Sequence, residues 1–84
     1  MRVELSNAAK KQFGRLNEPH QSLIAAALDK LEMEPPNGDI KKLQGKDGYR
    51  VRVGTYRILF DIEKDRIDVF SISPRGGAYR GAKK

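Results

Sequence analysis

Residues 49–60 read Y-R-V-R-V-G-T-Y-R-I-L-F, and the order of residue types here predicts the central part of the fold. Apolar and cationic residues alternate along it. Successive side chains of an extended strand point to opposite faces of a sheet. Tyr49, Val51 and Val53 therefore share one face of a first strand, and Arg50 and Arg52 share the other. The pattern predicts a strand with one apolar face and one cationic face.

The run that follows repeats the alternation and brings the chain back beside this strand. Arg57 falls on one face, and the apolar side chains fall on the other, namely Tyr56, Ile58, Phe60 and Ile62. A hairpin folded about residues 53–55 then carries at least three guanidinium groups on its cationic face. A hydrophobic core requires the apolar face, whereas nothing in folding requires the cationic one. The cationic face therefore indicates an anionic ligand.

The composition points the same way. The chain has 84 residues, so we expect one domain over 1–84 with one modest core, and a mobile basic tail over 75–84. Its 17 Lys and Arg residues exceed 11 Asp and Glu residues, giving a net charge of +6. That balance favours nucleic acid or an acidic protein as partner. The alternative is a soluble protein that is basic without such a partner.

Several other classes of protein are not expected. With no Cys and one His, the chain offers neither a thiol site nor an ordinary zinc site, and we expect no metal and no cofactor. The apolar runs are too short to cross a membrane, and the first residues do not begin a signal peptide. We therefore expect a cytoplasmic protein.

The flanking segments supply the remaining elements. Residues 2–5 predict a short strand, and Ser6 is a good N-cap for a helix over 7–16. Residues 17–19 end that helix and begin a second one, whose apolar stripe is Leu23, Ile24, Ala27, Leu28 and Leu31. A loop containing three lysines precedes the hairpin, and residues 66–72 form the last strand. The order β-α-α-β-β-β predicts an α+β fold, with a helical hairpin on one face of a small, mostly antiparallel sheet. The arginine-bearing face is left uncovered.

Three stretches of the sequence carry a resemblance. They are the loop K-K-L-Q-G-K-D-G at 41–48, the run already quoted at 49–60, and the ending I-S-P-R-G-G-A-Y-R at 72–80. Together with the order of elements they resemble the RelE/ParE superfamily of toxins from type II toxin–antitoxin pairs, most closely the RelE branch. This resemblance covers nearly the whole chain. It implies a ribosome-dependent endoribonuclease that cuts mRNA and inhibits translation, and a RelB-like antitoxin as partner in a hetero-oligomer.

The resemblance also implies a set of catalytic residues. The family's basic strand positions match Arg50 and Arg52, and the arginine of its Y-R-(I/L) motif matches Arg57. The family's late arginine matches Arg75, and its C-terminal tyrosine matches Tyr79. This chain departs from the pattern near that end. Many members have His-Arg-Arg-x-x-Tyr-like sequences, whereas here S-P-R-G-G-A-Y puts proline at the usual histidine position.

Cleaving RNA without a metal requires in-line attack by the 2′-OH, stabilisation of the dianionic transition state and a proton for the leaving 5′-oxygen. Arginines suit the second task, because guanidinium binds phosphate oxygens in a bidentate fork. Arginine stays protonated and is a poor general base. Tyr79, unless it is a packing anchor, is the remaining candidate for that role. We expect Lys41, Lys42 and Lys46 to contact RNA phosphates without sequence preference.

Each assignment has an alternative. Arg50 and Arg52 are otherwise solvated residues of an exposed strand, and Arg57 is otherwise an ion-pair partner of Asp61 or Asp68. Two other functions also fit. One is a non-enzymatic protein of the same fold, either a ParE-like inhibitor of DNA gyrase or an inactive relative that only binds its antitoxin. The other is a general binder of single-stranded RNA, which requires aromatic residues on the basic face.

Overall fold

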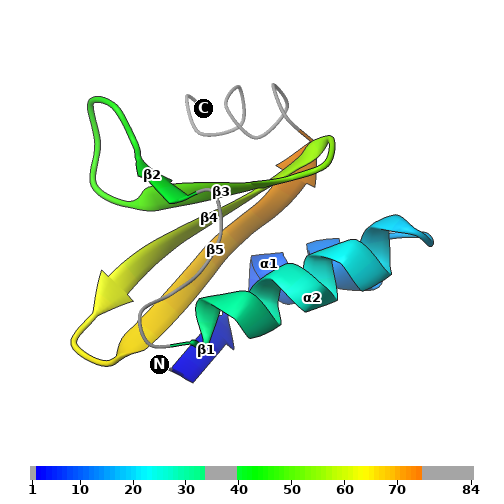
Figure 1. Ribbon diagram of the computed structural model, residues 1–84, viewed down its shortest axis with the longest axis horizontal. Coiled ribbons are helices and arrows are strands. Elements are labelled where there is room, and N and C mark those ends of the chain that lie inside the picture. Colours follow the sequence, from blue (N-terminus) through cyan, green and yellow to red (C-terminus); the bar gives the residue numbers. More distant parts are fainter. Residues whose placement is uncertain (1, 34–39, 75–84) are drawn as a thin grey trace.

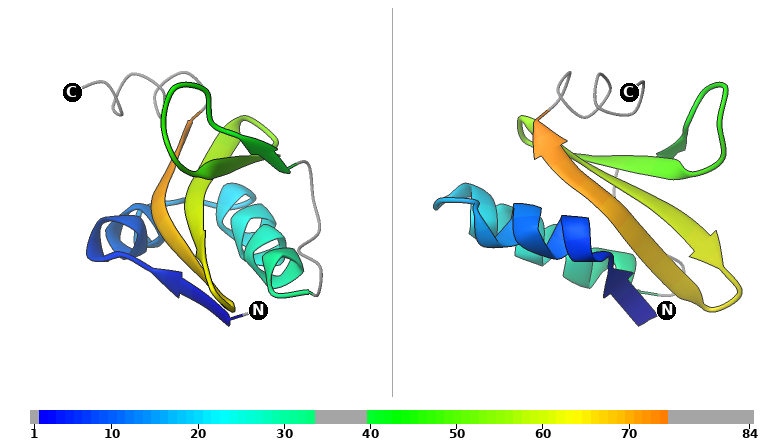
Figure 2. Two further views of the ribbon diagram at one scale, coloured as in Figure 1. Left: turned by 90° about the vertical axis from the view of Figure 1, so that its left-hand side faces the viewer. Right: turned by 180° about the vertical axis from the view of Figure 1, so that it is seen from behind.

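A five-stranded sheet with two helices on one of its faces makes up the fold (Figures 1 and 2). The computed structural model describes residues 2–33 and 40–74. In chain order the elements are β1 (Arg2–Leu5), α1 (Asn7–Gly14), α2 (His20–Leu31), β2 (Ile40–Lys42), β3 (Tyr49–Val53), β4 (Tyr56–Glu63) and β5 (Arg66–Pro74). The strand order is β1-β5-β4-β3-β2, with β1 parallel to β5 and every other pair antiparallel. The predicted α+β class and mostly antiparallel sheet are confirmed.

The hairpin of β3 and β4 forms as its sequence predicts. Val53 pairs with Tyr56, which leaves Gly54 and Thr55 as the turn. Gly54 has φ +60°, a left-handed conformation that glycine adopts without a Cβ clash. The register then places Val51 opposite Ile58. The apolar faces of the two strands therefore coincide.

The core lies between this apolar face and the two helices. Ala9 of α1 and Ile24 and Leu31 of α2 are buried against the sheet. The strands contribute Val51, Ile58, Phe60, Ile67, Val69 and Ile72. Burying a side chain of this kind stabilises a fold by about 1.5–3 kcal/mol, so this layer fixes which face of the sheet is covered. The other face keeps its charged residues.

The helix α1 begins as predicted and ends two residues early. The Ala9 N–H donates to the Ser6 hydroxyl at 3.1 Å, which confirms Ser6 as the N-cap. The helix ends at Gly14, whereas the pattern predicted residues 7–16. Its last turn tightens, because the Leu16 N–H donates to the carbonyl three residues back at 3.1 Å. Leu16 still packs against the core.

The helix α2 begins at His20, after the segment predicted to start it. Pro19 occupies the N-cap position and has no capping side chain of its own. Glu18 supplies the cap from the preceding residue, since its Oε1 accepts the Ser22 N–H at 3.1 Å. A carboxylate at this end also complements the helix dipole.

One strand, β2, was not predicted, because its residues were assigned to a lysine-containing loop. Its three residues carry no alternating apolar pattern, and they become a strand by pairing with the edge of β3. The turn between β2 and β3 closes where the Leu43 N–H donates to the Gly48 carbonyl at 3.0 Å. Gly48 has φ +117°, and a Cβ there would meet Asp61 Oδ1 at 3.1 Å. This turn therefore needs glycine at position 48.

A β-bulge in β5 changes which of its residues face the core. Leu59 pairs with Ser71 and Phe60 pairs with Val69, so Phe70 is an extra residue between the two pairs. Strict alternation would put Ile72 on the face opposite Val69. Because of the bulge, both are buried in the core. The bulge also leaves Phe70 exposed on the face without helices.

Candidate functional site

Four cations gather on the face of the sheet opposite the helices. Arg52 pairs directly with Arg57, and Lys41 pairs directly with Arg50. Directly paired residues share a face, and neighbouring strands lie about 4.8 Å apart. The predicted grouping of the three arginines is therefore confirmed, and Lys41 joins it. We call these four residues the basic end of the face.

The arginines of the basic end differ in exposure. Arg52 is exposed, whereas Arg50 and Arg57 are half-buried. Arg50 Nη1 is buried and has no hydrogen-bond partner within the described part of the chain. Arg57 Nε is buried as well, and Arg57 takes part in further interactions. A buried donor without an acceptor costs about 1–3 kcal/mol, so Arg50 lowers the stability of the fold at this position.

Two serine hydroxyls lie beside these cations. Ser73 pairs with Arg57, and Ser71 pairs with Leu59. The two hydroxyl oxygens are 3.4 Å apart, which places both serines on the cationic face. Leu59 lies among these polar groups and is only 4% exposed, although it is on the face without helices. Sequence reasoning missed the serines, although their spacing of two in S-I-S marks one face of a strand.

The opposite end of the same face is acidic, and two of its three carboxylates are paired within the fold. We call Glu4, Asp61 and Asp68 the acidic end. Arg66 donates to both oxygens of Asp68, at 2.7 and 3.1 Å, and Arg2 lies 3.0 Å from Glu4. The hydrogen bond and charge of Asp68 raise the pKa of the Arg66 guanidinium. The sequence allowed Asp68 as an ion-pair partner of Arg57. In the structure, Asp68 is bound by Arg66 instead.

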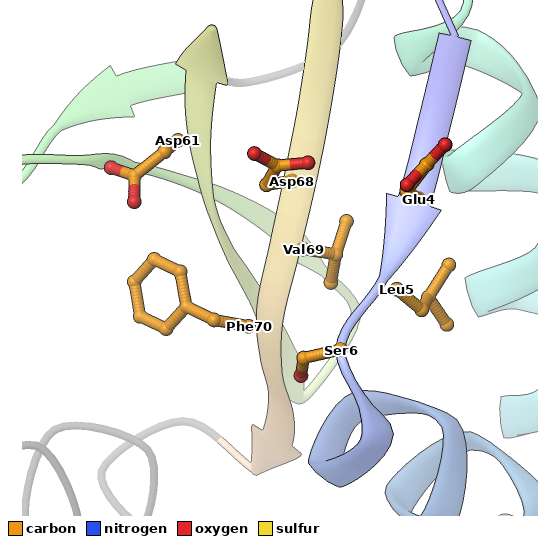
Figure 3. A pocket seen from close by; sticks show the side chains of 7 residues that line it. All are labelled: Glu4, Leu5, Ser6, Asp61, Asp68, Val69 and Phe70. Carbon is orange, nitrogen blue, oxygen red and sulfur yellow. The ribbon is translucent and has the colours of Figure 1, made fainter.

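A hollow of about 230 Å³ lies over the acidic end, beside Phe70 (Figure 3). The residues that line it are Glu4, Leu5, Ser6, Asp61, Asp68, Val69 and Phe70. In Figure 3, Phe70 and Asp61 project to the same side of β5, and Leu5 projects to the other side. The hollow therefore combines an aromatic ring with carboxylate acceptors.

The three predicted phosphate-binding lysines do not act as one group. Lys41 lies on the cationic face, as described. Lys42 pairs with Tyr49, whose ring stacks on Phe60 at a centroid distance of 5.8 Å, so Lys42 belongs to the other face. Lys46 lies in the turn between β2 and β3. The structure therefore brings only Lys41 to the arginines.

Arg75 and Tyr79, and the predicted tail over 75–84, lie outside the described residues. Within 2–33 and 40–74, no group of three or more His, Cys, Asp or Glu side chains is arranged to hold a metal ion. None of the helices in those ranges is both long and apolar enough to cross a membrane. The described part of the site is a set of cations and hydroxyls, which suits charge stabilisation rather than proton transfer.

The chain belongs to the family described as the ParE toxin of type II toxin–antitoxin systems, parDE, whose sequence profile matches residues 3–79. It is therefore a toxin of a type II toxin–antitoxin system. No curated protein matches the sequence significantly.

Solved structures of RelE proteins share the fold. A chain of the RelE–RelB complex from Pyrococcus horikoshii OT3 is 30% identical, with a TM-score of 0.76 over 89% of this chain and 94% of that one. The RelB–RelE complex from Methanococcus jannaschii matches at 22% identity and TM-score 0.75, over 92% and 95%. The isolated E. coli RelE toxin matches at 20% identity and TM-score 0.73, over 96% and 93%. The predicted RelE/ParE membership is confirmed.

Proposed function

We propose that this toxin is a ribosome-dependent endoribonuclease that cuts mRNA by metal-independent attack of the 2′-OH, and so inhibits translation in the cytoplasm. The observation that carries the proposal is the basic end. Arg52 and Arg57 face each other across β3 and β4, with Arg50 and Lys41 in the next row. Like charges placed directly opposite one another destabilise a sheet. A phosphate group between them offsets that cost.

The described residues supply charge stabilisation in this reaction. Guanidinium groups of Arg52 and Arg57 bind the non-bridging oxygens of the scissile phosphate, where negative charge develops. Arg50 lies in the next row and adds its positive charge to the same phosphate-binding face. Arg75 stabilises charge near the leaving 5′-oxygen, and Tyr79 acts as general base or orienting group. Holding the reactants in line on the ribosome contributes up to roughly 7–11 kcal/mol.

The partner that neutralises this toxin is a RelB-like antitoxin with an acidic segment. Two of the matched structures are toxin–antitoxin complexes, and the chain carries a net charge of +6. An acidic segment that covers the basic end would satisfy the same donors as RNA and would block the site. Toxin and antitoxin then form a hetero-oligomer.

The test is induction of the toxin in cells, followed by primer extension on translated messages. The proposal predicts defined cuts within translated regions and growth arrest. Arg57→Ala and Tyr79→Phe are each expected to reduce cutting strongly and to relieve the growth arrest. If both variants arrest growth and cut messages as the wild type does, the assigned site is wrong.

A second candidate is a ParE-like inhibitor of DNA gyrase, which the family match favours. The basic end then binds an acidic protein surface rather than RNA. This function predicts an SOS response and loss of gyrase supercoiling without RNA cuts. Primer extension and a supercoiling assay on the same purified toxin therefore separate the two candidates.

A further inference from the structure

We infer that Phe70 and the hollow beside it form a subsite for one base of a single-stranded RNA whose phosphates lie on the basic end. This inference rests on the proposed function and names how that site positions its substrate. Its first observation is the exposure of Phe70, which is 37% exposed on the face without helices. The other Phe and Tyr residues of the described part pack in or against the core, namely Phe13, Tyr49, Tyr56 and Phe60.

The β-bulge explains why an aromatic side chain lies there. Phe70 is the extra residue between the pairs formed by Leu59 with Ser71 and by Phe60 with Val69. Without the bulge, the strand would keep a strict alternation and Ile72 would lose its place in the core. Bulges recur beside active sites, where they redirect a side chain. Here the bulge places the Phe70 ring on the face without helices, which also carries the basic end.

The distance between ring and cations suits one nucleotide. Ser71, the neighbour of Phe70, pairs with Leu59, and Leu59 pairs with Arg50. Two strand spacings, or about 10 Å, therefore separate Arg50 from the bulged strand. A nucleotide with its phosphate at Arg50 spans about this distance and places its base against Phe70.

The hollow also supplies hydrogen-bond acceptors for the edge of the base. Asp68 is held by Arg66, whereas Asp61 projects to the same side as Phe70 (Figure 3). A carboxylate accepts a hydrogen bond from the exocyclic amino group of a base, such as N4 of cytosine. Uracil has no amino group, and its N3–H lies between two carbonyl oxygens that repel a carboxylate. The subsite therefore favours cytosine, adenine or guanine over uracil.

The direct test uses an RNA hexamer that carries 2-aminopurine at one position and 2′-O-methyl groups that prevent cleavage. Stacking on an aromatic ring quenches 2-aminopurine fluorescence. The purified full-length toxin is expected to quench it, and Phe70→Leu to lose the quench and bind on the order of tenfold more weakly. Phe70→Trp should keep the quench, because a larger ring also stacks. Thermal unfolding of each variant shows whether the fold is retained.

The matched control is Ile62→Ala. Ile62 is 38% exposed, close to the exposure of Phe70, but it pairs with Ile67 on the face of the core. This variant should quench and bind as the wild type does.

The base preference is tested at Asp61. On programmed ribosomes, Asp61→Asn should raise cutting at sites that place uracil in the subsite.

Two results would overturn the base subsite. One is a Phe70→Leu toxin that quenches the probe and cuts messages at the same rate and positions as the wild type; the proposed function then survives. The other is a Phe70→Leu toxin that loses affinity only for the antitoxin, which would make Phe70 a protein contact. A wild-type toxin that cuts no message overturns the proposed function itself, and the base subsite falls with it.

Discussion

The two ends of the face without helices carry opposite charges, and they differ in whether those charges have partners of opposite sign. At the acidic end, Arg66 holds Asp68 in a bidentate fork and Arg2 lies against Glu4. At the basic end, Arg52 lies opposite Arg57, and Lys41 lies opposite Arg50. Two of the three carboxylates at the acidic end are therefore paired with arginines, whereas the basic end gathers like charges and a buried donor. Like charges placed opposite one another and a buried donor lower the stability of a fold, and such features are expected where a protein binds a ligand.

Replacing a charge at each end gives the largest expected contrast. Arg57→Ala should lower the rate of mRNA cutting on ribosomes by about 10²–10³, because it removes a donor at the transition state. Arg66→Ala should leave that rate unchanged and lower the unfolding temperature slightly, because Asp68 loses its partner. Single-turnover cleavage and thermal unfolding of both proteins provide the comparison. Equal losses of activity would show that the two ends do not differ in role.

Salt should weaken RNA binding by the next largest factor. Four cations that each neutralise a phosphate of single-stranded RNA give a slope of about −2.8 in a plot of log affinity against log salt. Raising salt from about 50 to 200 mM then weakens binding roughly 50-fold. Fluorescence anisotropy with a non-cleavable RNA measures the slope. A slope near zero contradicts the phosphate-binding role of the basic end.

Arg50→Met should separate binding from stability. The substitution keeps an apolar stem of similar length and removes the buried Nη1 that has no hydrogen-bond partner in the described residues. We expect an unfolding temperature equal to or above that of the wild type, because a buried donor without a hydrogen-bond partner is removed. RNA affinity should fall by about 10- to 100-fold, the value of a hydrogen bond to a charged group. A variant that unfolds at much lower temperature would show that Arg50 supports the fold.

The smallest expected effect is at the serine beside Arg57. Ser73→Ala should slow cutting by roughly 2- to 10-fold, the worth of one neutral hydrogen bond. Ser22→Ala is the control, because Ser22 bonds to Glu18 at the start of α2 and lies away from the basic end. Cleavage rates of the two variants, measured in parallel, test whether the hydroxyls take part. Equal rates would remove Ser73 from the site.

Most of the fold follows from patterns that are local in the sequence. The alternation over 49–60 predicts β3, β4 and the covered face, and Ser6 predicts the start of α1. The missed strand, β2, has no such pattern, since its two lysines become part of a strand only through the edge that β3 offers. The bulge at Phe70 was also out of reach. It depends on fitting both Val69 and Ile72 into one core, which is a property of the packed fold.

Some features of the candidate site also follow from local sequence, and others depend on the folded structure. The grouping of Arg50, Arg52 and Arg57 follows from strand alternation and a hairpin turn predicted at residues 53–55; the structure narrows that turn to Gly54 and Thr55. The contribution of Lys41 and the exclusion of Lys42 depend on the register of β2, which the sequence does not encode locally. The pairing of Arg66 with Asp68 also required the fold, because sequence alone left Asp68 available to Arg57.

The most direct test of the central claim compares two charge-matched double variants on purified, programmed ribosomes. Arg52→Ala with Arg57→Ala removes two positive charges from the basic end, and Arg2→Ala with Arg66→Ala removes two from the acidic end. Both proteins have the same net charge, so general attraction to RNA falls equally. We predict that the first variant cuts no mRNA and that the second cuts at nearly the rate of the wild type. Equal loss of cutting in both, or a wild-type toxin that cuts nothing, would contradict the account.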